Sequence, residues 1–539
     1  MSDLSFFSRR APRRSAAVYL LTLLLGGWFS LSCYRVIPRS SLLCTALERV
    51  SGVLPVTAQQ LSSWGSAALC AAAALLSLLL FPRLLSDLGE LWRGMDRKRF
   101  FRALTTFDRP IPRILAMGLA DLLLAIFLGT VCMTAVVSLP VTPALEEHMA
   151  RSAETMEEEG AYPSLHPWCL SKLDNFTDSI MLLEAADDTE DTTLRRAMLM
   201  YRGQFIYETE LDPCATLIAH YREGEAYTGR ATYARYWHGY LLFLKPLLYF
   251  LDYSSLRLFN VLVQTALLLV LLWLMKKRGL SFAVIPWLLS AAMLTPSVIG
   301  HSLQFSTCYD LMTVGSVLLL AMWNGERREQ RTALLFLNLG AATAFFDFLT
   351  YPPAVFGMPA VLFLLLRRDS KTEDNLSALI RSGILWCAGY AVMWAGKWLV
   401  ASALVDKDVL RDALSAASYR VSSLDWGEVT EGTVLGTLLT NYGAFCFTPV
   451  TLLLLIRLLR CLRRGGSANV PSELRRVFPL LLTALIPVVW YTVLQNHSSV
   501  HFWFTNKDCV VTAFAVLSAA ALETAPASTG PSKPEKETA

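Results

Sequence analysis

The sequence is short of charge and of the motifs that mark soluble enzymes. Only 17% of its 539 residues are Asp, Glu, Lys or Arg, whereas soluble domains carry about 25%. It contains no GxGxxG, P-loop, GxSxG or kinase-like motif, which argues against a soluble nucleotide site. Its 11 cysteines show no CxxC spacing for a structural metal. These absences argue against an ordinary soluble domain.

Long apolar runs are what the sequence has instead. Hydrophobic residues make up 54% of the chain, the mean hydropathy is +0.43, and the runs reach the roughly 17–25 residues that cross about 30 Å of hydrocarbon as a helix. We predict an all-α polytopic membrane protein of about 12 transmembrane helices, with a large extracytoplasmic loop between the third and fourth. The predicted spans are 15–36, 64–84, 112–139, 255–275, 281–299, 307–324, 332–350, 353–367, 379–405, 435–458, 477–495 and 508–522.

The distribution of Lys and Arg predicts the orientation. Basic clusters such as "RRAPRR" (9–14), "KKR" (276–278) and "RLLRCLRR" (457–464) alternate with short loops that carry almost no basic residues. Basic loops stay cytoplasmic, so we expect both termini to be cytoplasmic and the protein to lie in a bacterial inner or plasma membrane. The expected divisions are a three-helix segment (1–139), an acidic loop with an interfacial helix (140–254), a nine-helix membrane domain (255–522) and a disordered cytoplasmic tail (523–539).

The large outer loop is the main soluble element. Residues 140–236 hold 18 acidic and 8 basic residues, a net charge of −10. Cys169 and Cys214 share this loop and form a disulfide candidate in an oxidising compartment. The apolar run at 239–251 is too short to span and is predicted as an interfacial helix. Its expected aromatic membrane anchors are Tyr236, Trp237 and Tyr249.

One acidic motif, "SKLDNFTDSIMLLEAADDTED" (171–191), lies inside this loop. Asp174 and Asp178 are four residues apart, so on a helix they share a face. Two carboxylates so placed suit a general base or a divalent-cation site. Carboxylates in a loop are more often solvated surface, but this pair is framed by apolar residues.

Other polar residues gather at the predicted outer ends of the helices. Ionisable groups at membrane depth are costly and mark functional sites, although each one singly can merely solvate a helix end. His497 and His501, four residues apart, suit phosphate or sugar hydroxyls better than a zinc ion. Asp121, inside the third span, is expected to make a helix–helix hydrogen bond. The candidate substrate-binding residues are Arg235, Trp237, His238, His301, Gln304, Asp347, Tyr351, Lys397, His497, His501 and Lys507.

Three stretches resemble the GT-C class of membrane glycosyltransferases. "LDNFTDSIM" looks like the acidic motif of that class, "RYWHGYLLFLKPLLYFLDYSSLRLFN" like the segment that follows it, and "NHSSVHFWFTNKD" like the late loop that contacts the donor phosphate. The resemblance covers the architecture and these short motifs. It implies a polyprenyl-phosphate sugar donor in the membrane and a glycan, lipid or protein acceptor, with no nucleic acid.

The resemblance also implies roles for the candidate residues. Asp174 or Asp178, with Asp174 favoured, would take the proton of the acceptor hydroxyl or hold a divalent cation such as Mg2+ or Mn2+. The cations of Arg235, Lys397 or Lys507 would stabilise the departing phosphate, helped by the cation or the late histidines. Trp237 or Trp503 would stack on sugar or prenyl.

A transporter or flippase for a lipid-linked or anionic solute is the alternative. Transporters tend to show paired halves and helices broken near the midplane. The sequence shows no internal repeat, and its polar residues gather at one face, which favours an enzyme. A structural or assembly role also stays open.

Overall fold

The computed structural model describes residues 89–105, 111–166, 170–207, 210–405, 408–422, 433–445 and 470–522, and these are mostly helical. The bundle consists of α5 (Arg97–Thr105), α6 (Ile111–Val137), α12 (Tyr253–Lys277), η1 (Ser281–Ala283), α13 (Val284–Met293), α14 (Pro296–His301), α15 (Leu303–Met322), α16 (Arg328–Phe346), α17 (Pro352–Leu366), α18 (Thr372–Val405), α19 (Val409–Val421), α20 (Val434–Phe445), α22 (Val470–Thr483), α23 (Ile486–Val493), α24 (Gln495–Val500), α25 (Phe502–Thr505), η2 (Asn506–Asp508) and α26 (Cys509–Leu522). The rest forms a small end domain.

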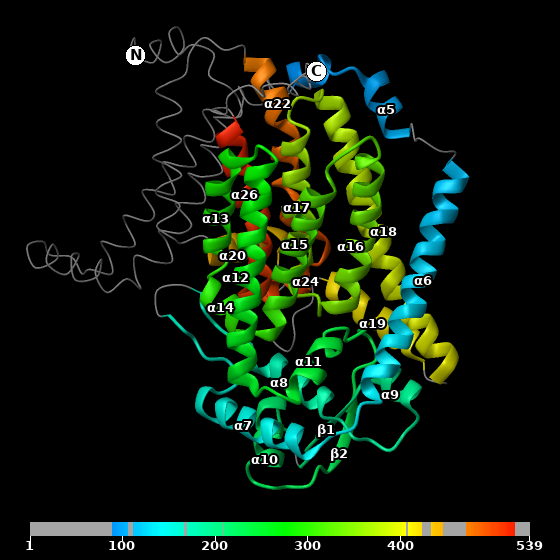
Figure 1. The fold of residues 1–539 in the computed structure, drawn as a ribbon, viewed down its shortest axis with the longest axis vertical. Coiled ribbons are helices and arrows are strands. Elements are labelled where there is room, and N and C mark those ends of the chain that lie inside the picture. Colours follow the sequence, from blue (N-terminus) through cyan, green and yellow to red (C-terminus); the bar gives the residue numbers. More distant parts are fainter. Residues whose placement is uncertain are drawn as a thin grey trace, which may run out of the picture.

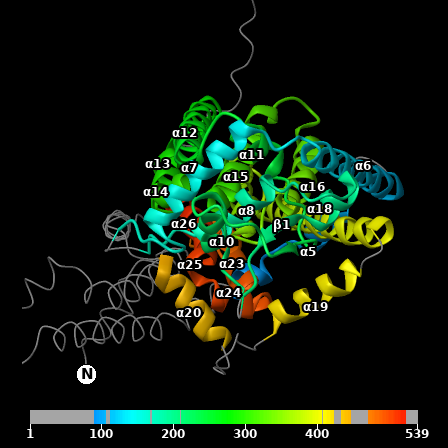
Figure 2. The same cartoon turned by 90° about the horizontal axis from the view of Figure 1, so that it is seen from below.

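The end domain lies across one end of the bundle. It consists of α7 (Pro143–Glu159), α8 (Asn175–Ala185), α9 (Thr193–Leu199), β1 (Tyr201–Gln204), α10 (Pro213–Tyr221), β2 (Gly229–Thr232) and α11 (Leu241–Leu248). It occupies the bottom of Figure 1, while α5 and the start of α22 lie at the top. Seen from below, α7, α8 and α10 cover the bundle, and α6 and α19 stand at one side (Figure 2).

Five helical segments among the described residues are long and apolar enough to cross a membrane, so the chain is an integral multi-pass membrane protein. They are Arg113–Val137, Tyr253–Lys277, Leu303–Met322, Thr372–Val405 and Arg475–Val493. They confirm the predicted spans at 112–139, 255–275, 307–324, 379–405 and 477–495. The predicted spans 15–36 and 64–84, and most of 435–458, lie outside the described residues.

The count of about twelve membrane-length helices is not what the described chain contains. The predicted span 281–299 is broken into η1, α13 and α14. The spans 353–367 and 508–522 are α17 and α26, of 15 and 14 residues, which reach only about 20–23 Å at 1.5 Å per residue. The span 332–350 is α16, whose 19 residues begin with the charged stretch "REQR" and which is not among the five. Hydropathy located these helices, but none of them is among the described helices that are long and apolar enough to cross a membrane.

Capping side chains fix where the end-domain helices begin. Asp174 caps α8, Thr192 caps α9 and Asp212 caps α10, each accepting a backbone N–H of the first turn. A two-stranded antiparallel sheet, with Tyr201 opposite Thr232, is the part of this domain that the all-α prediction missed. Its strands have only four residues each, too few for a visible alternation of apolar and polar residues.

The predicted interfacial helix is present and short. Its exposed aromatic residues differ from the expected membrane anchors. The 239–251 run forms α11, eight residues long with Pro246 inside it. Tyr236 and Trp237 are buried in the end domain, so they do not face lipid. The large exposed aromatics of this segment are Phe243 and Phe250.

Close packing of α16 against α18 holds the bundle together. A Cβ atom at Gly340 would collide with the carbonyl oxygen of Trp386, and one at Gly389 with that of Leu337. Small residues at such crossings let membrane helices approach closely. Nearby, Asn338 on α16 donates a 2.8 Å hydrogen bond to Asp121 on α6, which confirms the expected helix–helix contact.

Basic residues gather at the end of the bundle opposite the end domain. There Arg99 pairs with Asp374, and Arg278 donates to the carbonyl of Leu320 at the end of α15. In Figure 1 this is the end at which α5 lies. The alternation of basic and neutral loops therefore corresponds to two physical ends of the bundle, and which end faces the cytoplasm stays a prediction.

Candidate functional site

The acidic motif docks the end domain onto the bundle. Asp178 on α8 is fully buried. Its carboxylate accepts the backbone N–H groups of Leu303 and Gln304, both at 2.9 Å, and the hydroxyls of Tyr253 at 2.6 Å and Ser302 at 3.4 Å. Leu303 begins α15, and a helix N-terminus carries partial positive charge that favours an anion. Asp178 therefore supplies the negative charge that holds α8 against the start of α15.

The neighbouring Asn175 extends this docking network. Its side-chain oxygen accepts a 3.1 Å hydrogen bond from Arg257, and its amide donates to Glu159 at 2.9 Å. Arg257 closes the loop through an ion pair of 2.6 Å with Glu159. Side chains from α7, α8 and α12 are thus joined in one polar cluster.

Asp174 stands outside this cluster. It caps α8 by accepting the backbone N–H of Thr177 at 3.1 Å, and its exposed fraction is 3%. Burial raises the pKa of Asp174 to about 6, with the Asp178 charge adding to the effect. A carboxylate with a pKa near 6 is ionised at neutral pH yet basic enough to take up a proton in a reaction.

Metal binding by Asp174 and Asp178 stays a prediction. Among the described residues, no group of three or more His, Cys, Asp or Glu side chains is placed to hold a metal ion. Both oxygens of Asp178 already face hydrogen-bond donors, which a cation would have to displace. For the predicted disulfide, Cys214 carries a free thiol and Cys169 lies outside the described residues.

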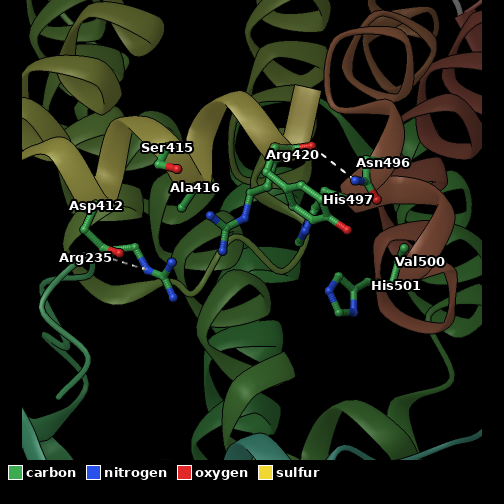
Figure 3. Close-up of a pocket in the computed structure, with 10 residues that line it drawn as sticks. Arg235, Asp412, Ser415, Ala416, Arg420, Asn496, His497, Val500 and His501 are labelled. Carbon is green, nitrogen blue, oxygen red and sulfur yellow. Dashed lines mark hydrogen bonds and ion pairs between the residues drawn. The ribbon is translucent and has the colours of Figure 1, made fainter. Parts of the chain in front are cut away.

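A separate cavity gathers three of the predicted binding residues. It has a volume of about 540 Å3 and lies between α19 and α24, with Arg235 at one side (Figure 3). We call it the arginine–histidine pocket. Its lining residues are Arg235, Asp412, Ser415, Ala416, Tyr419, Arg420, Asn496, His497, Val500 and His501.

Two guanidinium groups give the pocket its charge. Arg235 lies 3.7 Å from the carboxylate of Asp412, which is itself largely exposed. Arg420 donates a 2.8 Å hydrogen bond to the hydroxyl of Tyr236. Among the residues that the structure describes, Arg420 forms no salt bridge with a carboxylate. In Figure 3 Arg235 lies beside Asp412, on the opposite side of the pocket from His501. Two arginines against one aspartate leave the pocket with an excess of positive charge.

The two histidines face each other with ring centroids 5.0 Å apart. The Nε2–H of His497 donates to the carbonyl of Leu349 at 2.8 Å. Burial lowers the pKa of His497, with the proximity of His501 and Arg420 contributing. Burial and Arg420 also lower the pKa of His501, to about 4. Both rings are therefore neutral at pH 7 and serve as hydrogen-bonding groups beside the cationic arginines.

Three other predicted binding residues are buried where the end domain meets α18. The ammonium group of Lys397 donates to the carbonyls of Ala197 and Met198 at the end of α9. Trp237 donates from its indole to the Met393 carbonyl. His238 is held between the carboxylate of Glu184 at 2.9 Å and the carbonyl of Tyr233 at 2.7 Å. Their contacts are structural and none of the three lines the pocket.

The remaining predicted residues lie at bundle helix ends. The His301 ring contacts the carbonyl of Ser297, Asp347 accepts the N–H of Thr350, and the Tyr351 hydroxyl donates to the Phe305 carbonyl. Lys507 donates to the Trp503 carbonyl and lies 4.2 Å from the Phe305 ring. Gln304 contributes its backbone to the Asp178 cluster. These residues join α15, the 347–351 turn and the α25 region to one another.

Sequence reasoning missed Arg420, Asp412 and Asn496. The first two come from α19, whose polar face is readable in "VLRDALSAASYRV". Asn496 is adjacent to the predicted His497, and its amide donates to the Tyr419 carbonyl at 3.1 Å. The signal for these residues in the sequence is the position of 409–421 after a predicted span, on the same predicted face as the late loop.

No family model, curated protein or solved structure matches the chain. The geometry of the site is therefore the basis for its function.

Proposed function

We propose that this protein is a membrane glycosyltransferase that moves a sugar from a polyprenyl-phosphate donor to an acceptor at the extracytoplasmic face. The arginine–histidine pocket is the observation that carries the proposal. A donor phosphate is an anion, and Arg235 and Arg420 offer the planar N–H groups that match phosphate oxygens.

The pocket's position suits a lipid-linked donor. It is formed where the bundle adjoins the end domain, by α19, α24 and the segment that precedes α11. At that level a headgroup is reached by protein while its prenyl chain stays among the membrane helices. The absence of basic residues from most short loops at this end supports the outward orientation.

Asp174 is the proposed base. The acceptor hydroxyl oxygen attacks the anomeric carbon, the bond from that carbon to the phosphate oxygen breaks, and its electron pair leaves with polyprenyl phosphate. Arg235 and Arg420 stabilise the charge that develops on the phosphate, and Asp174 receives the hydroxyl proton. Asp178 acts only by holding α8 in place.

Contacts through Trp503 connect the proposed base to the pocket. The Trp503 ring lies 5.2 Å from the His501 ring on the pocket side. The Lys172 ammonium lies 4.5 Å from the same ring, and Lys172 precedes Asp174 by two residues. This continuity supports one reaction centre shared by the end domain and the late loop.

The test is sugar transfer by the full chain in nanodiscs, with polyprenyl-phosphate carrying a radiolabelled sugar. Asp174→Asn keeps a good N-cap and should lower the transfer rate by roughly 100- to 10,000-fold while donor binding persists. Asp188→Asn changes an exposed aspartate of the same domain and should leave the rate unchanged. Full transfer by Asp174→Asn, or movement of intact donor across the membrane without transfer, would refute the proposal.

A further inference from the structure

An aromatic cluster lies beside Asp174, and the mechanism above does not account for all of it. Tyr162 and Phe176 stack with ring centroids 5.9 Å apart, and Trp503 meets Tyr162 edge-on at 6.2 Å. The ammonium group of Lys172 lies 4.0 Å from the Tyr162 ring and 4.5 Å from the Trp503 ring. Tyr162 is 42% exposed and the others are half-buried, so the cluster, which we call the aromatic platform, has an open face.

Backbone hydrogen bonds hold the platform in shape. The N–H of Phe176 donates to the Ala161 carbonyl at 3.2 Å, and that of Leu173 donates to the Pro163 carbonyl at 2.8 Å. A β-bridge between Ser164 and Lys172 completes the turn. These bonds fix Tyr162 and Lys172 relative to the capping residue Asp174, so the platform and the carboxylate form one preorganised unit.

Two polar atoms along this surface have no hydrogen-bond partner in the described part of the chain. They are the indole Nε1 of Trp503 and the ring Nδ1 of His501, both shielded from solvent. Buried polar atoms are normally paired, so each unpaired one calls for an explanation. Here the two belong to residues whose rings are in contact, at the junction of the platform and the arginine–histidine pocket.

We propose that the aromatic platform binds the acceptor, and that the acceptor is a glycan presenting a pyranose ring. This inference rests on the proposed function, of which it specifies the acceptor class. The apolar C–H face of a sugar packs on aromatic rings, while its hydroxyls pair with the Lys172 ammonium. A hydroxyl directed at Asp174 is then next to the proposed base.

The chemistry of the platform favours a glycan over a lipid acceptor. The Lys172 ammonium lies over the Tyr162 ring, and Asp174 follows Lys172 by two residues, and a prenyl or acyl chain gains nothing from either charge. A polyhydroxylated ring uses both kinds of surface, because it has apolar faces and polar edges.

Saccharide binding tests the proposal apart from catalysis. Saturation-transfer NMR on the full chain in nanodiscs would use neutral trisaccharides of glucose, galactose, mannose and N-acetylglucosamine as probes. We expect at least one trisaccharide to bind through its ring C–H protons. Tyr162→Ala and Trp503→Ala should each weaken that binding by about tenfold, and Tyr207→Ala, which removes an exposed tyrosine elsewhere in the end domain, should not. Thermal unfolding checks that each variant is folded.

A parallel measurement separates this inference from the proposed function. Binding of polyprenyl phosphate reports on the arginine–histidine pocket alone. Saccharide binding that depends on Tyr162 and Trp503 supports the platform even where polyprenyl phosphate fails to bind, which would contradict the donor assignment. Binding of polyprenyl phosphate with no saccharide bound, or saccharide binding unaffected in both alanine variants, overturns the platform and leaves the donor assignment standing.

Discussion

The carboxylate of Asp178 accepts the backbone N–H of Gln304 at 2.9 Å, which joins the end domain to the first turn of α15. Asp174 and Asp178 of the acidic motif thus have different environments. Asp178 is saturated by donors from α12 and α15, whereas Asp174 caps its own helix beside an aromatic surface. A docking residue and a proposed base are separated by one helical turn.

This difference predicts opposite effects for the two Asn substitutions. In Asp178→Asn one carboxylate oxygen becomes an NH2 group, which would face the N–H of either Leu303 or Gln304. That buried donor is then left unpaired, at a cost of about 1–3 kcal/mol. The melting temperature of the purified protein should fall, and protease should cleave the end domain sooner. Asp174→Asn should unfold as the wild type does. Equal stability of the two variants would contradict the docking role.

The α16–α18 contact predicts a sharp size limit at one glycine. Gly340→Ala places a Cβ atom against the Trp386 backbone, which cannot move without displacing α18, and overpacking of this kind costs about 1–3 kcal/mol. Gly118→Ala on α6 is the matched control, because its Cβ would meet the Leu337 side chain at an ordinary 3.7 Å. Gly340→Ala should lower the melting temperature, and Gly118→Ala should not. A Gly340→Ala variant as stable as Gly118→Ala would refute the close approach.

The raised pKa of Asp174 predicts how transfer depends on pH. Protonated Asp174 cannot accept the hydroxyl proton, so kcat/KM should rise with pH through about 6 and level off above it. Stability changes in the opposite sense: a carboxyl whose folded pKa is raised favours the folded state when protonated, so its contribution becomes less favourable as pH rises from about 4 to 6. A rate that increases over this range is therefore not caused by improved folding.

The histidines of the pocket should not produce that inflection. The pKa of His501 is lowered to about 4 and that of His497 is also lowered, so both stay neutral from pH 6 to pH 8. His501→Gln should change the rate but keep the inflection near pH 6. Measurement of kcat/KM from pH 5 to 8 checks this, and loss of the inflection in His501→Gln would assign it to the imidazole instead.

Hydropathy and charge predicted the membrane class and five of the spans, because α6, α12, α15, α18 and the 475–493 segment are each long and apolar. They failed for α17 and α26, whose apolar character comes from burial inside the protein rather than from contact with lipid. An apolar run does not distinguish these two environments when it is only about 15 residues long.

The candidate site was predictable only where its residues lie in loops of one predicted face. Arg235, His497 and His501 were found in this way and do line one pocket. Lys397 is a predicted substrate-binding residue because it is a charged residue within a span. Its partners are the carbonyls of Ala197 and Met198, about 200 positions earlier in the chain. A single sequence carries no sign of such backbone partners.

Binding of polyprenyl phosphate to the arginine–histidine pocket is the most direct test of the proposed function. Arg235→Gln and Arg420→Gln each remove a charged donor, and a hydrogen bond to a charged group is worth about 1.5–3 kcal/mol, or roughly 10- to 100-fold in affinity. Arg222→Gln is the control, since Arg222 is an exposed arginine of the end domain that pairs with Glu154.

The measurement is the dissociation constant of polyprenyl phosphate for the full chain in nanodiscs made with uncharged lipid. We expect tight binding by the wild type and Arg222→Gln, weaker binding by each pocket variant, and loss of binding by Arg235→Gln/Arg420→Gln. Undiminished binding by that double variant would contradict the assignment of the pocket as the site of the donor phosphate.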